Sequence, residues 1–107
     1  MSIKKYKVYV IELLPEALED GVFGYENRDC NPSLPCYYVG MTSLTPEERF
    51  QNHRDGYKSS RIAHRYGVCL VPELYEQYNP MTYEEAKRKE LELTAELKQK
   101  GHGVWSR

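Results

Sequence analysis

The feature that most constrains the fold is a long amphipathic helix predicted near the end of the chain. Thr82 is a helix N-cap, Glu85 follows as its capping-box partner, and Gly101 ends the pattern. The residues between are strong helix formers, and a helix of about 19 residues would be roughly 28 Å long. A chain of 107 residues makes one domain with one modest core, so the apolar face of this helix should pack inward.

One carboxylate interrupts that inward face. The positions i, i+4, i+7 and i+11 of the helix are Ala86, Glu90, Leu93 and Leu97. A buried carboxylate is costly unless it is paired or binds a metal. Three interpretations of Glu90 stay open: half of a buried salt bridge, with Arg49 as a candidate partner, a residue at the frayed edge of the face, or a functional group.

Three strands are predicted. Residues 6–14 are rich in β-branched and aromatic side chains and end at a proline. Both faces of that strand are largely apolar, which suggests that it is covered on both sides. A second strand over 36–41 ends near Gly40, and a third over 68–75 contains Pro72, which indicates an edge or a break.

Two more helices lie between the second and third strands. Thr45, Pro46 and Glu48 predict a helix over 46–56, and a serine cap and a glycine stop predict a shorter one within 59–67. The order β–β–α–α–β–α predicts an α/β domain: a small three-stranded antiparallel sheet flanked by helices. One domain, 1–107, holds all of it, with a loop insertion at about 15–35 that could include one helical turn around Glu16 to Leu18. The tail 102–107 can add a short strand or pack Trp105 against the core.

Composition narrows the class of protein. No long apolar run suggests a membrane span or a signal peptide, so a soluble, cytoplasmic protein is expected. Three cysteines without a C-x-x-C pair fit buried or incidental thiols rather than disulfides or zinc. The net charge of −1 is unlike that of a dedicated nucleic-acid binder, but residues 49–66 are locally basic. They carry one acid, Asp55, against Arg49, Arg54, Lys58, Arg61 and Arg65, with His53 and His64 in addition.

Several polar residues could share one site. Arg49 and His53 lie four apart, on one face of the predicted helix, beside an apolar stripe of Phe50 and Tyr57. A solvated basic flank is the alternative interpretation. Tyr9 in the first strand and Tyr37 and Tyr38 in the second bring phenols together if the two strands pair, although tyrosines are also ordinary strand residues.

Together these residues resemble the GIY-YIG nuclease domain. The first motif reads Lys7-Val8-Tyr9 and the second reads Tyr38-Val39-Gly40. Arg49 follows Tyr38 by eleven residues, and His53 follows in an Arg-x-x-x-His pattern. Glu90 corresponds to the family's helical glutamate. The resemblance covers nearly the whole chain and agrees with its element order. The insertion is longer than the family's usual link, and Ser106 stands where the family often has asparagine.

The resemblance implies an endonuclease that hydrolyses DNA with Mg²⁺ or Mn²⁺. Glu90 would bind the metal, and Arg49 would contact the scissile phosphate. Tyr9 or Tyr38 would help activate the attacking water, with Tyr38 favoured. His53 would relay a proton or hydrogen-bond a tyrosine.

DNA is the partner that this function implies, with branched and single-stranded forms as candidates, and an oligomer or a partner protein would supply further specificity. The residues expected to contact its backbone are Arg54, Lys58, Arg61, His64 and Arg65. Two alternatives stay open at this point. The chain could be a non-catalytic nucleic-acid-binding domain that keeps the fold, or a protein-interaction module that uses exposed tyrosines.

Overall fold

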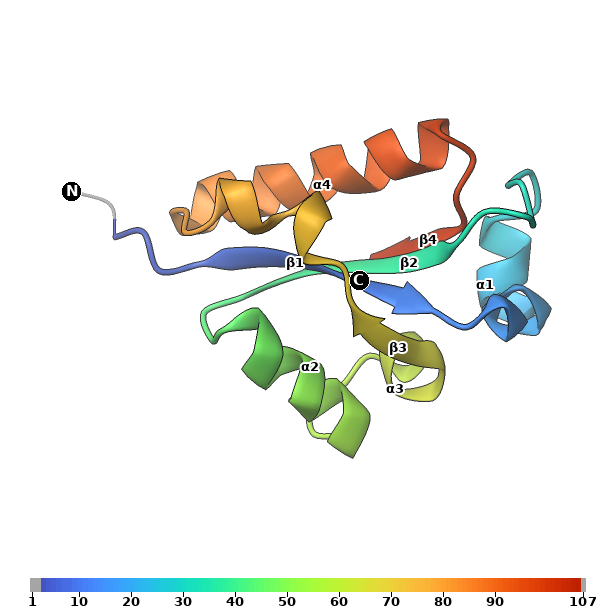
Figure 1. Ribbon diagram of the computed structural model, residues 1–107, viewed down its shortest axis with the longest axis horizontal. Coiled ribbons are helices and arrows are strands. Elements are labelled where there is room, and N and C mark those ends of the chain that lie inside the picture. Colours follow the sequence, from blue (N-terminus) through green and yellow to red (C-terminus); the bar gives the residue numbers. More distant parts are fainter. Residues whose placement is uncertain (1–2, 107) are drawn as a thin grey trace.

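The sheet formed by residues 3–106, the part of the chain that the computed structural model describes, has four strands in the order β3-β1-β2-β4 (Figure 1). The strands are β1 (Lys7–Leu13), β2 (Cys36–Thr42), β3 (Gly67–Leu70) and β4 (Val104–Ser106). Strand β1 pairs antiparallel with β2 and with β3, whereas β4 pairs parallel with β2. The two longest strands, β1 and β2, therefore lie in the middle of the sheet.

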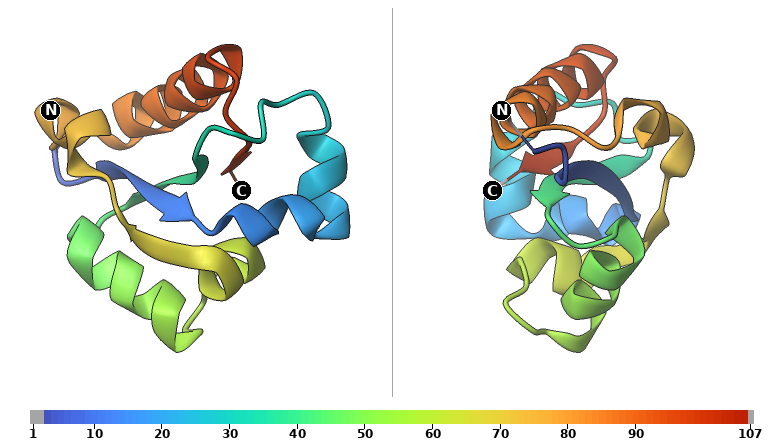
Figure 2. Two further views of the ribbon diagram at one scale, coloured as in Figure 1. Left: turned by 45° about the vertical axis from the view of Figure 1, so that its right-hand side comes forward. Right: turned by 90° about the vertical axis from the view of Figure 1, so that its left-hand side faces the viewer.

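Helices cover both faces of this sheet. Residues 3–106 form the α-helices α1 (Gly21–Glu26), α2 (Pro46–Asp55), α3 (Arg61–Tyr66) and α4 (Tyr83–Gln99), and short 3₁₀ turns at Pro15–Glu19, Pro72–Leu74 and Glu76–Tyr78. Helix α4 lies along one face, and α2 and α3 lie against the other (Figures 1 and 2). Within this part of the chain, no helix is both long enough and apolar enough to cross a bilayer.

The α/β class is confirmed, but the predicted three-stranded antiparallel sheet is wrong. The strand left out of that count is β4; the tail was expected to be able to add a short strand, but three residues are too few to show an alternating pattern. Its direction follows from the chain path, because β3, α4 and β4 form a crossover that returns the chain parallel to β3 and hence to β2. Both expectations for the tail hold, since Trp105 is in this strand and its ring also lies 6.2 Å from that of Phe23.

The predicted loop insertion at 15–35 contains a second surprise, the helix α1, so the order β–β–α–α–β–α is incomplete. Asp20 caps α1 by accepting the N–H groups of Val22 and Phe23, each at 3.2 Å. The side chain of Phe23 is fully buried in the core. Six residues that include two glycines look like a loop in the sequence, and the buried Phe23 explains why they are helical instead.

The side chain of Asn27 joins this insertion to β4 by two hydrogen bonds. Its side-chain nitrogen donates to the carbonyl oxygen of Val104 at 3.2 Å, and its side-chain oxygen accepts the N–H of Val104 at 2.9 Å. Asn27 is buried, so the two bonds are shielded from water. The side-chain amide of Asn27 thus bonds the backbone N–H and C=O of Val104 at the sheet edge, as a neighbouring strand would. The insertion is therefore part of the sheet's support.

We expect Asn27→Ala to lower the free energy of unfolding by about 2–4 kcal/mol, because the buried N–H and C=O of Val104 would lose their partners. Urea unfolding followed by circular dichroism measures this loss. Asn31→Ala is the control, since the Asn31 side chain only accepts the exposed N–H of Ser33. Equal losses in the two variants would contradict a role for Asn27 in holding β4.

Both predicted capping boxes are present. The Thr45 hydroxyl accepts the N–H of Glu48 at 3.1 Å and the Glu48 carboxylate accepts the N–H of Thr45 at 3.0 Å. Thr82 and Glu85 make the same pair of bonds at the start of α4. Gly56 ends α2 with a φ of 78°, a conformation that favours glycine. These local signals fix where each helix begins relative to the strands.

The predicted apolar stripe of Phe50 and Tyr57 is wrong in one member. Phe50 packs partly buried against the core, whereas Tyr57 is 59% exposed. The reason is that α2 ends at Asp55, so Tyr57 lies beyond the helix and does not continue its period.

Candidate functional site

Two tyrosine phenols meet on the face of the sheet that α2 covers. In the register of β1 with β2, Tyr9 lies opposite Gly40 and Tyr38 lies opposite Ile11, so both side chains point to the same face. Their ring centroids are 6.2 Å apart, and each residue is 1% exposed. A Cβ atom at Gly40 would lie 2.5 Å from the hydroxyl oxygen of Tyr9. The side chain of Tyr9 therefore packs directly against Gly40, where a larger residue would not fit.

His53 completes this cluster from α2. It is 0% exposed, its Nε2 lies 2.9 Å from the hydroxyl oxygen of Tyr9, and its ring centroid lies 5.3 Å from that of Tyr38. Its Nδ1 accepts the backbone N–H of Ser60 at 3.2 Å. A backbone N–H can only donate, so we assign the neutral ring with its proton on Nε2. His53 therefore donates a hydrogen bond to Tyr9.

The surroundings of Tyr9 keep its phenol neutral. Burial raises the pKa of Tyr9 most strongly; the neighbouring Tyr38 raises it further by charge and by a side-chain hydrogen bond, whereas Arg49 lowers it. A hydrogen bond raises the pKa of a phenol when that phenol is the donor, because the neutral form is stabilised. Burial and the neighbouring Tyr38 therefore favour the neutral form of Tyr9, whose hydroxyl oxygen accepts the N–H of His53.

Arg49 lies one helical turn before His53 and joins the cluster to the turn that follows α2. Its guanidinium donates to the carbonyl oxygens of Lys58 at 2.8 Å and Tyr57 at 3.5 Å. Lys58 has a φ of 47°, which few residues other than glycine adopt. The positive charge of Arg49 also lowers the pKa of Tyr9. A guanidinium has five N–H donors, so some are left for an anion.

We expect His53 to make the free energy of unfolding fall between pH 6.5 and pH 4. Burial, with Arg49 and His64 as further causes, lowers the pKa of His53 to about 4, against about 6.5 for an exposed histidine. Through that window the unfolded chain binds a proton that the folded protein does not, so the stabilisation is complete above pH 6.5 and is lost as the pH falls toward 4. Protonation of Nδ1 would also remove the hydrogen bond from Ser60, because two N–H donors would then face each other.

Urea unfolding of the wild type and of His53→Gln, at pH 7 and at pH 4, measures this contribution. The decrease in unfolding free energy on going to pH 4 should be smaller in the variant by about 3 kcal/mol. Carboxylates that titrate in the same window are present in both proteins and cancel in the comparison. The same pH dependence in both proteins would contradict the burial of a neutral His53.

Glu90 lies on the buried face of α4, as predicted, and is 7% exposed. It lines a pocket of about 310 Å³ together with Met41, Tyr83, Lys87 and Leu91. Met41 is the neighbour of Gly40 in β2, and successive strand residues point to opposite faces. The pocket of Glu90 and the phenol of Tyr9 thus lie on the two sides of β2, at nearly the same point along it.

The edge of β2 connects these two sides. Strand β4 pairs with residues 37–39, so within residues 3–106 no strand covers that edge of β2 at residues 40–42. The structure therefore brings Tyr9, Tyr38, Arg49 and His53 together, and it places Glu90 across the strand from them. A ligand that lies over the edge at residues 40–42 could approach both.

The predicted nucleic-acid contacts divide into two groups. Three exposed cations lie 5.5 to 5.8 Å over the rings of Phe50, Tyr57 and Tyr66: Arg54, Lys58 and Arg65. The other two have structural partners. Arg61 forms an ion pair with Asp20 at 2.6 Å, and His64 Nδ1 lies 2.8 Å from the carbonyl oxygen of His53. The first group thus keeps its positive charges exposed, where phosphates of a nucleic acid could reach them.

Two parts of the site were not predicted from the sequence. The N–H of Ser60, which sets the tautomer of His53, is a backbone group that any residue except proline would supply. Met41 lines the pocket of Glu90, but it is an ordinary strand residue in the sequence. The alternation of faces along β2 could have placed Met41 toward α4, once Gly40 had been placed toward α2.

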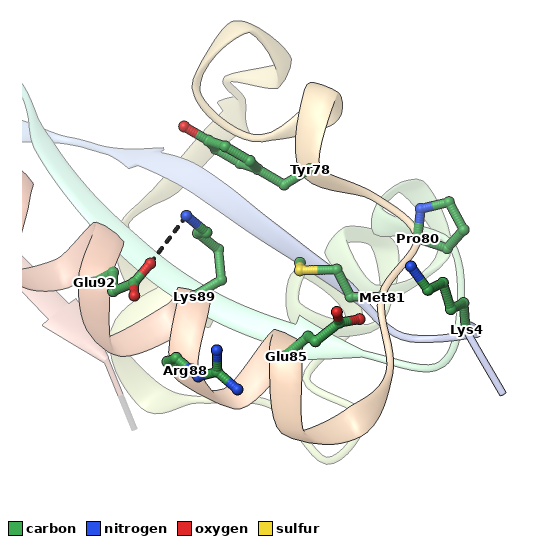
Figure 3. Close-up of a pocket in the computed structure, with 8 residues that line it drawn as sticks. All are labelled: Lys4, Tyr78, Pro80, Met81, Glu85, Arg88, Lys89 and Glu92. Carbon is green, nitrogen blue, oxygen red and sulfur yellow. Dashed lines mark ion pairs between the residues drawn. The ribbon is translucent and has the colours of Figure 1, made fainter. Parts of the chain in front are cut away.

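A second hollow of about 310 Å³ lies on the other flank of α4 (Figure 3). Three of its charged residues already have partners. Lys89 lies 4.2 Å from the ring centroid of Tyr78 and pairs with Glu92 at 2.9 Å, and the Glu85 carboxylate accepts the N–H of Thr82. The residues of the tyrosine cluster are not among its walls, so it gives no support to the predicted chemistry.

The carboxylate of Glu90 fits only one kind of metal site. Among residues 3–106, no three or more His, Cys, Asp or Glu side chains are grouped so as to hold an ion. A zinc site needs such a group. A Mg²⁺ or Mn²⁺ ion is often bound through one or two carboxylates, with waters and substrate phosphates as the other ligands. The latter arrangement is compatible with Glu90.

No protein-family model, no curated protein and no solved structure matches this chain. The fold and the cluster define the class only as a small α/β domain with a four-stranded mixed sheet and a buried tyrosine–histidine group. Any closer assignment rests on the residues themselves.

Proposed function

We propose that the protein is an endonuclease of the GIY-YIG type, which hydrolyses phosphodiester bonds in DNA with Mg²⁺ or Mn²⁺. The observation that carries this proposal is the buried cluster of Tyr9, His53 and Tyr38 beside Arg49. These four residues come from three separate segments, and each occupies its place in the motif pattern. A polar cluster in a core is costly to keep unless it is fully hydrogen-bonded or has a function.

Tyr38 is the better candidate for activating the attacking water, because burial and the neighbouring phenol raise the pKa of Tyr9 and disfavour its ionised form. An unperturbed phenol has a pKa of about 10 and is ionised only to about 0.1% at pH 7. Arg49, whose charge acts on Tyr9 in the same cluster, would supply the positive charge that such ionisation needs and keeps donors for the scissile phosphate.

His53 acts in this proposal as a positioning residue. Two roles were open for it, a proton relay and a hydrogen bond to a tyrosine. The N–H of Ser60 occupies Nδ1, so the ring has no lone pair free to accept the proton of Tyr9. This supports the second role, in which His53 orients Tyr9 toward Tyr38.

Glu90 would hold the divalent ion on the other side of β2. Such an ion polarises the phosphoryl group and stabilises the leaving oxygen. The DNA strand would cross the edge of β2 at residues 40–42, with Arg49 on one side and Glu90 on the other. Arg54, Lys58 and Arg65 would neutralise flanking phosphates, which gives affinity without sequence preference.

Nicking of supercoiled plasmid tests this function. Wild-type protein should convert it to the open circle with Mg²⁺ or Mn²⁺ and should not do so with EDTA. A wild type that cuts no better than its Arg49→Ala and Glu90→Ala variants, at every metal and salt concentration, would disprove the enzymatic proposal. Retained DNA binding in that case would favour the non-catalytic alternative.

A further inference from the structure

The pocket beside Glu90 has one aromatic wall that is open to a ligand. Tyr83, at the first position of α4, is 47% exposed. Its ring meets that of Tyr6 edge to face, with centroids 5.3 Å apart and an interplanar angle of 79°. An edge-to-face contact fixes the ring and covers little of its area. Tyr83 is therefore a rigid and partly exposed platform.

The charges of this pocket select where an anion can lie. Lys87 is exposed on the turn of α4 after Tyr83, and the buried Glu90 lies one turn further along. A phosphate would be attracted by Lys87 and repelled by the carboxylate unless a cation lay between them. The apolar walls Met41 and Leu91 suit a flat, uncharged group. An aromatic face, an apolar floor and one lysine are the parts of a site for a single nucleotide.

We propose that this pocket binds an unpaired nucleotide of the DNA, with its base on Tyr83 and its phosphate at Lys87. The inference rests on the proposed function, because the pocket adjoins Glu90. A volume of about 310 Å³ is at the lower end of small-ligand sites, which suits one nucleotide and not a duplex. Bases inside a duplex have both faces stacked, so they cannot reach Tyr83. Single-stranded or branched DNA is thereby the preferred substrate class.

The hollow of Figure 3 differs from the pocket of Glu90, because its tyrosine ring is already in contact with a cation. It has the same volume and also contains a tyrosine, but the cation of Lys89 already lies against the ring of Tyr78. Lys89 is in turn paired with Glu92. A base would have to displace these contacts, whereas Tyr83 and Lys87 would meet it directly.

Binding measured without cleavage tests the proposal independently of the nuclease activity. Fluorescence anisotropy in EDTA would compare a labelled single-stranded oligonucleotide with its duplex. Tyr83→Ala should weaken single-strand binding by roughly 5- to 100-fold, the range for loss of one stacked base. Duplex affinity should stay within about twofold. Tyr83→Phe keeps the stacking face and should bind the single strand like the wild type.

Tyr25→Ala is the matched control. Tyr25 is another exposed tyrosine with a neighbouring cation, Arg28, but it lies on α1. It should leave single-strand binding unchanged. Three results would each overturn the proposal: no single-strand binding by the wild type, unchanged binding by Tyr83→Ala, or equal losses for single strand and duplex. If plasmid nicking fails while Tyr83→Ala loses single-strand binding selectively, the pocket stands and the enzymatic proposal falls.

Discussion

Gly40→Ala should disrupt the tyrosine cluster and lower the free energy of unfolding by about 3 kcal/mol. The added Cβ would lie 2.5 Å from the hydroxyl oxygen and 2.6 Å from Cζ of Tyr9, far inside van der Waals contact. Tyr9 cannot move aside easily, because it is 1% exposed and packs against His53 and Tyr38. Overpacking of a filled core typically costs about 1–3 kcal/mol. Urea unfolding measures the loss.

Gly21→Ala provides the control for this substitution, since a Cβ at Gly21 meets nothing within 4 Å. It should change the free energy of unfolding by less than about 0.5 kcal/mol. A double-mutant cycle isolates the contact: in a Tyr9→Ala background the cost of Gly40→Ala should largely disappear. An unchanged cost in that background would show that the glycine is needed for another reason. Because the phenol is displaced, nicking activity should fall with stability.

Local chemistry made the well-capped elements predictable. The starts of α2 and α4 follow from hydrogen bonds between residues three apart, namely Thr45 with Glu48 and Thr82 with Glu85. Such bonds depend on neighbouring residues alone, so they can be inferred without knowledge of the fold. The buried face of α4 follows for a similar reason, because its period is set by helix geometry.

The elements that the sequence missed or left open depend on contacts between distant parts of the chain. Strand β4 exists because Asn27 satisfies Val104 on one side and β2 pairs with it on the other. Helix α1 exists because Phe23 is buried. A three-residue strand and a six-residue helix have too few local interactions to be stable alone, and accordingly their sequences carry no pattern. Their stability comes from tertiary packing.

In the candidate site, too, local patterns were predictable and contacts between distant parts of the chain were not. Spacing on one helix placed Arg49 and His53 on a common face, and strand pairing brought Tyr9 near Tyr38. The sequence could not assign a direction to their hydrogen bonds, because that direction depends on the N–H of Ser60, seven residues beyond His53. Nor could it show that β2 separates Glu90 from the tyrosines. That separation is a property of the layers, and it makes the uncovered edge at residues 40–42 the central feature of the proposal.

Replacement of Arg49 or Glu90 should cause the largest losses of activity. Arg49→Lys keeps the positive charge but removes the forked donors, and Glu90→Gln keeps the shape but removes the charge. Each should reduce the rate of plasmid nicking by about 10²–10³-fold, the usual effect of removing one group that stabilises the transition state. Unfolding midpoints must accompany the rates, because Arg49 also holds the carbonyl oxygens of Tyr57 and Lys58.

Matched controls come from the same two helices. Arg54→Lys changes an exposed arginine of α2 that lies over the ring of Phe50, and it keeps the charge that would neutralise a flanking phosphate. Glu92→Gln changes an exposed glutamate of α4 that pairs with Lys89. Both should nick plasmid within about threefold of the wild type, since exposed pairs contribute little. If Glu90→Gln and Glu92→Gln are equally active in Mg²⁺ and in Mn²⁺, Glu90 does not hold the metal. If Arg49→Lys matches Arg54→Lys, the guanidinium does not touch the scissile phosphate.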